Sequence, residues 1–147
     1  MAKDFMITQA AAQSQLTALE TSLDAGTAAV IIGYDDDAAI PANADASSAG
    51  SESLFDLTCS ASVFTSKTDG NPNAVGTFAA ITADTNANVT DTLAFFRILT
   101  QAAGTVICQG TAGVGTFDMA VNTTAITSGS TVDDTGTNTL TIVEGGT

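Results

Sequence analysis

Two neighbouring apolar runs within residues 91–110 constrain the fold most. In the first run, residues 93–99, large apolar side chains occupy odd and even positions alike, so both faces of an extended segment would be apolar. A strand of this kind is typical of the middle of a sheet that is covered on both sides. A short turn at residues 101–104 and a second apolar run at residues 105–108 complete the pattern of a β-hairpin. Arg97, the only arginine, interrupts the first run. We expect its stem to pack and its guanidinium to pair with a carboxylate, a loop carbonyl or a neighbouring subunit.

The rest of the chain repeats short apolar runs between turn residues. Aromatic residues make up only 5 % of the chain, while 13 glycines punctuate the segments. Abundant threonine also favours strands through its β-branched side chain. Strands at this spacing predict an all-β fold, a β-sandwich or jelly roll. We expect further strands at residues 28–34, 54–60, 62–66, 76–83, 115–122 and 138–144, with a turn at residues 67–73. Residues 54–60 and 62–66 are either two strands or one strand with a bulge near Ala61.

One helix is expected, at residues 9–24. Its narrow apolar stripe consists of Ala12, Leu16, Leu19 and Leu23. Thr8 precedes it as an N-cap, and Gly26 follows where a left-handed stop would fall. The stripe suits packing against a sheet edge or a neighbouring subunit. With 147 residues we expect a single domain over residues 1–147, an N-terminal arm and helix (1–26) followed by a β-sandwich (27–147).

The charge of the chain excludes several function classes. Sixteen acidic residues against three basic ones give a net charge of −13. Such a surface repels nucleic acid and anionic lipid, so we expect no nucleic-acid partner and no membrane partner. No apolar run reaches the ~20 residues of a spanning helix, and the N-terminus shows no apolar core of a secretory signal. Histidine is absent, which removes the commonest general base, and we expect no enzymatic activity and no cofactor.

Acidic loops raise the question of a metal site. Residues 84–88 and 69–73 each begin like a calcium loop, but neither has the glycine and the glutamate that an EF-hand loop needs at positions six and twelve. Turns capped by their own Asp and Asn side chains explain both segments. The triplet Asp35, Asp36 and Asp37 opens a long loop over residues 35–53. A divalent cation shared between subunits is one interpretation, but side-chain alternation separates neighbours, so a solvated loop without metal is expected. The loop itself is expected to be exposed and mobile, or an arm that orders in an assembly.

Cys59 and Cys108 lie in alternating apolar runs. We expect two buried free thiols that pack as small hydrophobic groups. A disulfide between neighbouring strands is the alternative. Without histidine the pair is not expected to bind zinc.

The order of several motifs resembles a family of known proteins. The helix ends L-x-x-L-x-x-x-L-x-x-G (residues 16–26) and leads into a short strand and an acidic loop. Then follow F-F-R-I-L-x-x-A-x-G-T-V-I (residues 95–107), N-T-T-x-I (residues 122–126) and a terminal T-L-T-I (residues 139–142). This order is similar to that of small structural virion proteins of tailed bacteriophages, over most of the chain.

The resemblance implies a particle component without catalysis. Since the chain is strongly acidic, we expect a capsid decoration (cement) protein on the outer capsid surface, which binds the major capsid protein and forms a homotrimer. The candidate contact residues are Phe5, Met6, Ile7, Asp35, Asp36 and Asp37. Avidity over many copies would supply the affinity. The alternatives are a tail or baseplate component, and a carbohydrate-binding module in which Tyr34 would be the exposed aromatic residue.

Overall fold

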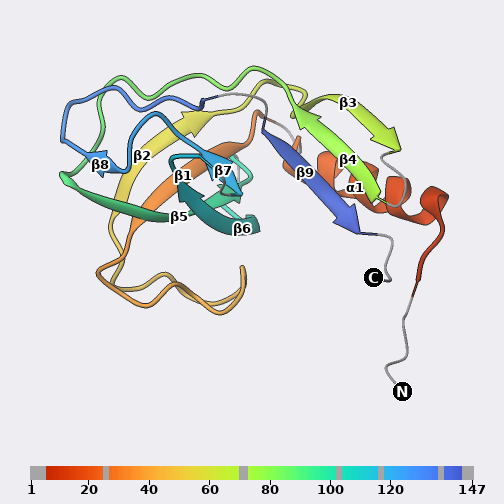
Figure 1. Cartoon of the computed structure of the whole chain (residues 1–147), viewed down its shortest axis with the longest axis horizontal. Coiled ribbons are helices and arrows are strands. Elements are labelled where there is room, and N and C mark those ends of the chain that lie inside the picture. Colours follow the sequence, from red (N-terminus) through yellow and green to blue (C-terminus); the bar gives the residue numbers. More distant parts are fainter. Residues whose placement is uncertain are drawn as a thin grey trace.

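Strand β5 (Asp91–Leu99) lies in the middle of the larger of two β-sheets (Figure 1). The computed structural model describes residues 6–24, 27–69, 73–101, 104–115, 118–135 and 138–143. Five strands of the larger sheet follow the order β2-β1-β5-β6-β7, and β8 also pairs with β5. The strands that pair with β5 are β1 (Val30–Asp35), β6 (Val106–Gly113) and β8 (Ala125–Ile126). Strand β2 (Ser53–Thr58) pairs with β1, and β7 (Met119–Ala120) pairs with β6. All pairs are antiparallel except β6 with β7.

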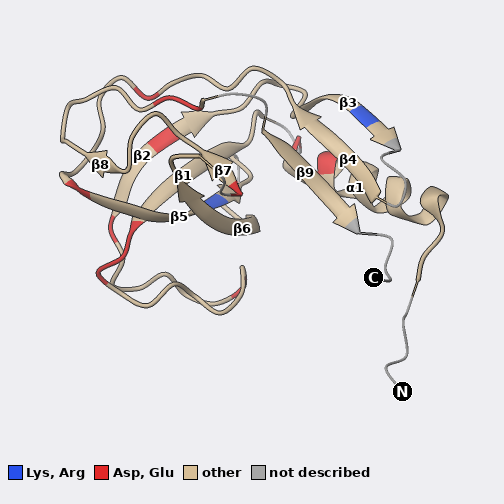
Figure 2. Cartoon of the chain, in the orientation of Figure 1, with Lys and Arg blue, Asp and Glu red and all other residues tan. Residues whose placement is uncertain are grey.

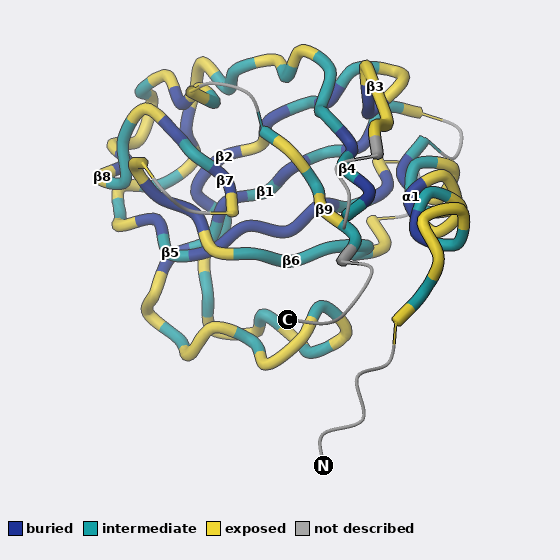
Figure 3. Tube along the Cα trace, turned by 45° about the vertical axis from the view of Figure 1, so that its right-hand side comes forward, coloured by how far each residue is buried: buried dark blue, intermediate teal, exposed yellow. Residues whose placement is uncertain are grey.

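The second sheet has three antiparallel strands in the order β3-β4-β9. They are β3 (Phe64–Asp69), β4 (Asn73–Phe78) and β9 (Thr139–Val143). Helix α1 (Gln9–Leu23) lies beside this sheet, with its outer side exposed (Figure 3). Gly76 of β4 allows close approach, because a Cβ there would lie 3.1 Å from a methyl carbon of Leu16. The helix therefore packs on the sheet through a position without a side chain.

One hydrophobic cluster joins the helix to both sheets. Ala12, Leu16 and Leu23 of α1 are completely buried, and they belong to the same cluster as Ile31 of β1 and Ile98 of β5. The burial of apolar side chains from the helix and the two curled sheets supplies the main stabilisation of the fold. This arrangement confirms the predicted all-β fold with an N-terminal helix.

The local predictions are confirmed for the helix and the central hairpin. The Thr8 hydroxyl accepts a hydrogen bond from the Ala11 amide at 3.3 Å, as expected of an N-cap. Both faces of β5 are buried around Phe95 and Phe96, as its pattern indicated. The expected stop at Gly26 lies outside the described residues.

Several strand boundaries predicted from the sequence are wrong. Residues 67–69 and 73 were expected to form a turn, but they belong to β3 and β4, which pair as a hairpin. Strand β4 ends at Phe78, so the strand expected at residues 76–83 is displaced toward the N-terminus. Over residues 115–122 only Met119–Ala120 is strand among the described residues. The preference of a residue for strands depends strongly on its neighbours, so pairing with adjacent strands decides these boundaries.

Candidate functional site

The N-terminal segment carries an apolar side chain on the surface. Met6 lies just before the N-cap of α1 and is 68 % exposed, whereas Ile7 is partly buried against the core cluster. Phe5, the third apolar residue proposed as a contact, lies outside the described residues. Ile40 in the long loop and Val114 after β6 are the other large apolar residues described as exposed, at 46 % and 58 %. Met6 is thus the most exposed of this group.

The triplet at the end of β1 is divided between the surface and the interior. Asp36 and Asp37 are exposed, but Asp35 is completely buried. The proposal of Asp35 as a surface contact therefore needs correction. Asp35 is the last residue of β1, and its side chain is buried in the protein interior. Its Oδ2 accepts a hydrogen bond from the Glu52 amide at 2.9 Å.

The fold brings a third carboxylate to Asp35 and Asp37. Asp91 is the first residue of β5, which runs antiparallel to β1. The last residues of β1 and the first residues of β5 therefore lie side by side at one end of the strands. One carboxylate oxygen from each of the three residues lies within 4.8 Å of the others. We call Asp35, Asp37 and Asp91 the acidic cluster. Asp91 was not among the residues predicted from the sequence, because it lies 54 residues beyond Asp37 in the chain.

Repulsion between these carboxylates affects their protonation. The pKa of Asp37 is raised above its usual 3.8, mainly by the negative charge of Asp91 and then by that of Asp35. Figure 2 shows acidic residues along this end of the first sheet, while the described cations, Lys67 on β3 and Arg97 on β5, lie elsewhere. Lys67 pairs with Glu20 of α1. The acidic cluster therefore has no cationic partner among the described residues.

The long loop after β1 is anchored to the sheet by side chains of β5 and β6. Arg97 and Gln109 lie opposite each other in the strand pairing. The Arg97 Nη2 donates to the Ala46 carbonyl at 2.6 Å and its Nε donates to Gln109 Oε1 at 3.0 Å. The Gln109 Nε2 in turn donates to the Pro41 carbonyl at 2.7 Å. This confirms the loop carbonyl as a partner of the arginine, and it shows the loop attached rather than free.

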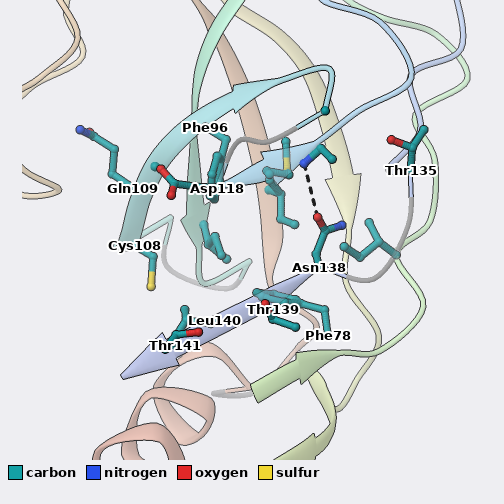
Figure 4. Close-up of a pocket in the computed structure, with 17 residues that line it drawn as sticks. Phe78, Phe96, Cys108, Gln109, Asp118, Thr135, Asn138, Thr139, Leu140 and Thr141 are labelled. Atoms are coloured by element: carbon teal, nitrogen blue, oxygen red, sulfur yellow. Dashed lines mark hydrogen bonds between the residues drawn. The ribbon is translucent and has the colours of Figure 1, made fainter. Parts of the chain in front are cut away.

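A cavity of about 730 Å³ lies between the two sheets (Figure 4). Phe96, Cys108 and Gln109 line it from the first sheet, and Leu140 lines it from β9. Two of its polar side chains, Asp118 and Asn138, already have partners within the chain. Asp118 Oδ2 accepts from the amide and the hydroxyl of Thr111, both at 2.8 Å, and Asn138 Oδ1 accepts from the Ala120 amide at 3.4 Å. These side chains hold neighbouring segments together.

Both cysteines are free, as predicted, and Cys59 is buried as expected, whereas Cys108 is only partly buried. Burial raises the pKa of the Cys59 thiol to about 12, with smaller contributions from Asp24 and Asp134, and burial also raises the pKa of Cys108. Only the thiolate is a good nucleophile, so both side chains act as packing groups at neutral pH.

Two further predictions concern Asp84 and Tyr34. Asp84 Oδ1 accepts from the Asn86 amide at 2.8 Å, so residues 84–86 form the self-capped turn expected in place of a calcium loop. The ring of Tyr34, the candidate sugar platform, stacks on Phe95 with centroids 5.0 Å apart. This contact covers one of the two ring faces that a sugar would need.

Comparison of the chain with known protein families, with curated proteins and with solved structures found no match. Within the described part of the chain, no helix combines the length and the apolar character that crossing a bilayer requires.

Proposed function

We propose that this chain is a structural virion protein of a tailed bacteriophage, which decorates the outer capsid surface and bridges subunits of the major capsid protein. The observation that carries the proposal is the exposure of Met6, which presents an apolar side chain in front of α1 on a strongly acidic protein. The motif order in residues 95–107 and 122–126 supports the same assignment. The all-β fold with one helix suits a protein that acts by adhesion.

Binding would be shared between apolar and acidic contacts. Burial of Met6, with the rest of Ile7, against a capsid subunit contributes about 1.5–3 kcal/mol for each fully buried side chain. Asp36 and Asp37 are exposed and can pair with basic residues of the shell. A homotrimer presents three such surfaces at once, and the linked contacts raise avidity without any new type of contact. The summed binding free energy opposes expansion of the shell by packaged DNA.

The test compares phage particles whose genome encodes the chain with particles that lack it. Particles without the protein should lose infectivity sooner on heating and on sudden dilution from high salt, and added protein should restore survival. Equal survival of both particles would refute the role in reinforcing the capsid.

A substitution of the exposed Met6 side chain tests binding to the shell without disturbing the buried core of the protein. Met6→Ser should bind the shell at least tenfold more weakly, because ~1.4 kcal/mol of apolar burial corresponds to a factor of ten. Val114→Ser is the matched control, since it removes another exposed apolar side chain outside the N-terminal segment. Equal binding of both variants, measured by cosedimentation with undecorated shells, would contradict the proposed contact. Sedimentation equilibrium of the free protein tests the homotrimer.

A further inference from the structure

The acidic cluster has the geometry of a cation site. One carboxylate oxygen from each of its three residues lies within 4.8 Å of the others, where β1 ends and β5 begins. Ca²⁺ binds oxygen ligands at 2.3–2.6 Å, so two ligands on opposite sides of one ion are about 5 Å apart. The spacing of the cluster therefore lies within the span of a single Ca²⁺ coordination shell.

Asp35 supplies an independent indication of a ligand. Its side chain is completely buried, and of its two oxygens only Oδ2 has a hydrogen-bond partner, the Glu52 amide. Oδ1 is buried without any partner. A buried carboxylate oxygen that lacks a partner is costly, and buried charges in proteins are normally paired or bound to a metal. The free Oδ1 is thus the atom that the fold leaves for a cation.

The neighbouring charges point the same way. Asp37 and Asp91 lie close enough to each other and to Asp35 for their negative charges to repel. The two described cations are engaged elsewhere, Lys67 with Glu20 and Arg97 with loop and strand acceptors. No side chain among the described residues offsets three carboxylates held this close, whereas a bound divalent cation would.

We propose that Asp35, Asp37 and Asp91 bind one Ca²⁺ ion, with Asp35 Oδ1 as the buried ligand. The ligands are all oxygen, which suits Ca²⁺ and excludes the sulfur and nitrogen ligands that favour zinc. Asp37 is exposed, so solvent reaches the site, and water completes the coordination shell. The ion fixes the first residues of the long loop to the start of β5. Asp37 is also a proposed shell contact, but the cation site rests on the geometry of the cluster alone and its test needs no shell.

The test uses the full-length chain stripped with EDTA and titrated with CaCl₂ by calorimetry. We expect one ion per chain with a Kd of about 1 mM or tighter, the range of calcium modules of low affinity. Asp37→Asn and Asp91→Asn should each weaken binding at least tenfold. Asp36→Asn is the matched control, because it removes the neighbouring exposed carboxylate, which is not part of the cluster. Its affinity should stay within twofold of the wild-type value.

A second readout places the ion. Terbium(III) occupies Ca²⁺ sites and luminesces when a nearby tyrosine is excited, and the single tyrosine, Tyr34, directly precedes Asp35. Terbium emission should rise in the wild type and in Asp36→Asn, fall on addition of CaCl₂, and stay low in Asp37→Asn. In EDTA the Asp37→Asn variant should unfold at the same temperature as the wild type or higher, because it relieves repulsion. This control separates loss of binding from loss of fold.

Three results would overturn the proposal. The first is no heat of binding and no terbium emission at millimolar concentration. The second is unchanged affinity in Asp37→Asn and Asp91→Asn. The third is an equal loss in Asp36→Asn, which would show only a diffuse attraction of cations to an acidic surface.

Discussion

The attachment of the long loop depends on Arg97, and its replacement by methionine tests this directly. Arg97 is only 4 % exposed, and its guanidinium donates to the Ala46 carbonyl and to Gln109 Oε1. Methionine fills similar volume without a donor. Arg97→Met should therefore release the middle of the loop while the base of the loop, held by the contacts between Asp35 and Glu52, remains closed.

The size of the effect follows from these contacts. Hydrogen bonds that involve a charged group contribute about 1.5–3 kcal/mol each, so the two bonds of Arg97 are worth about 3 kcal/mol at the lower bound. The guanidinium of Arg97 is a buried charge that no carboxylate pairs with, and burying such a charge costs free energy. Its removal should therefore offset about 1 kcal/mol of the loss. The free energy of unfolding should fall by about 2 kcal/mol, and Tm by about 6 °C for a chain of this size.

Urea denaturation measures the global change, and amide hydrogen exchange measures the loop. The amides of residues 38–50 should exchange faster in Arg97→Met than in the wild type, with little change in β5 and β1. Lys67→Met is the control, because it removes a partly exposed ion pair with Glu20 that is worth less than 1 kcal/mol. If Arg97→Met costs no more than Lys67→Met, or if loop exchange is unchanged, the loop is not held by Arg97.

Three further predictions follow from packing and protonation. Gly33→Ala places a Cβ 2.3 Å from the Phe55 ring, which is completely buried, and should cost about 1–3 kcal/mol in urea unfolding; a smaller loss would show that the ring can move aside. The Cys59 thiol, with a pKa of about 12, should react with a thiol reagent at pH 8 only after unfolding; rapid labelling of the native protein would contradict its burial. Among the described residues, four carboxyl groups have a pKa raised above 3.8 in the fold, so the native state binds more protons than the unfolded state just above that pH. The free energy of unfolding in EDTA should therefore decrease as pH rises from 3.8 toward neutrality, and an increase over that interval would refute the shifts. These groups are Asp24, Asp37, Asp56 and Asp134.

The sequence predicted the elements whose signals are local. The two apolar faces of residues 93–99 indicated the central strand, and Thr8 with the apolar stripe indicated the helix. The free thiols were also predicted, and a loop carbonyl was one of the three partners that the sequence left open for Arg97.

Features that depend on pairing between distant segments were missed. Asp91 joins Asp35 only through the register of β1 with β5, and Gln109 reaches the loop only because it lies opposite Arg97. Sequence patterns show which face of a strand is apolar, but they do not show which strand lies beside it. The sequence offered one signal for the acidic cluster: Asp91 is an aspartate at the first position of the predicted central strand.

The copy number of the protein in purified phage particles tests the proposed function most directly. Quantitative mass spectrometry gives the ratio of this chain to the major capsid protein in the same sample. A capsid decoration protein should be present in amounts comparable to the major capsid protein. A ratio that corresponds to a few copies per particle, or the absence of the chain from intact particles, would contradict the account.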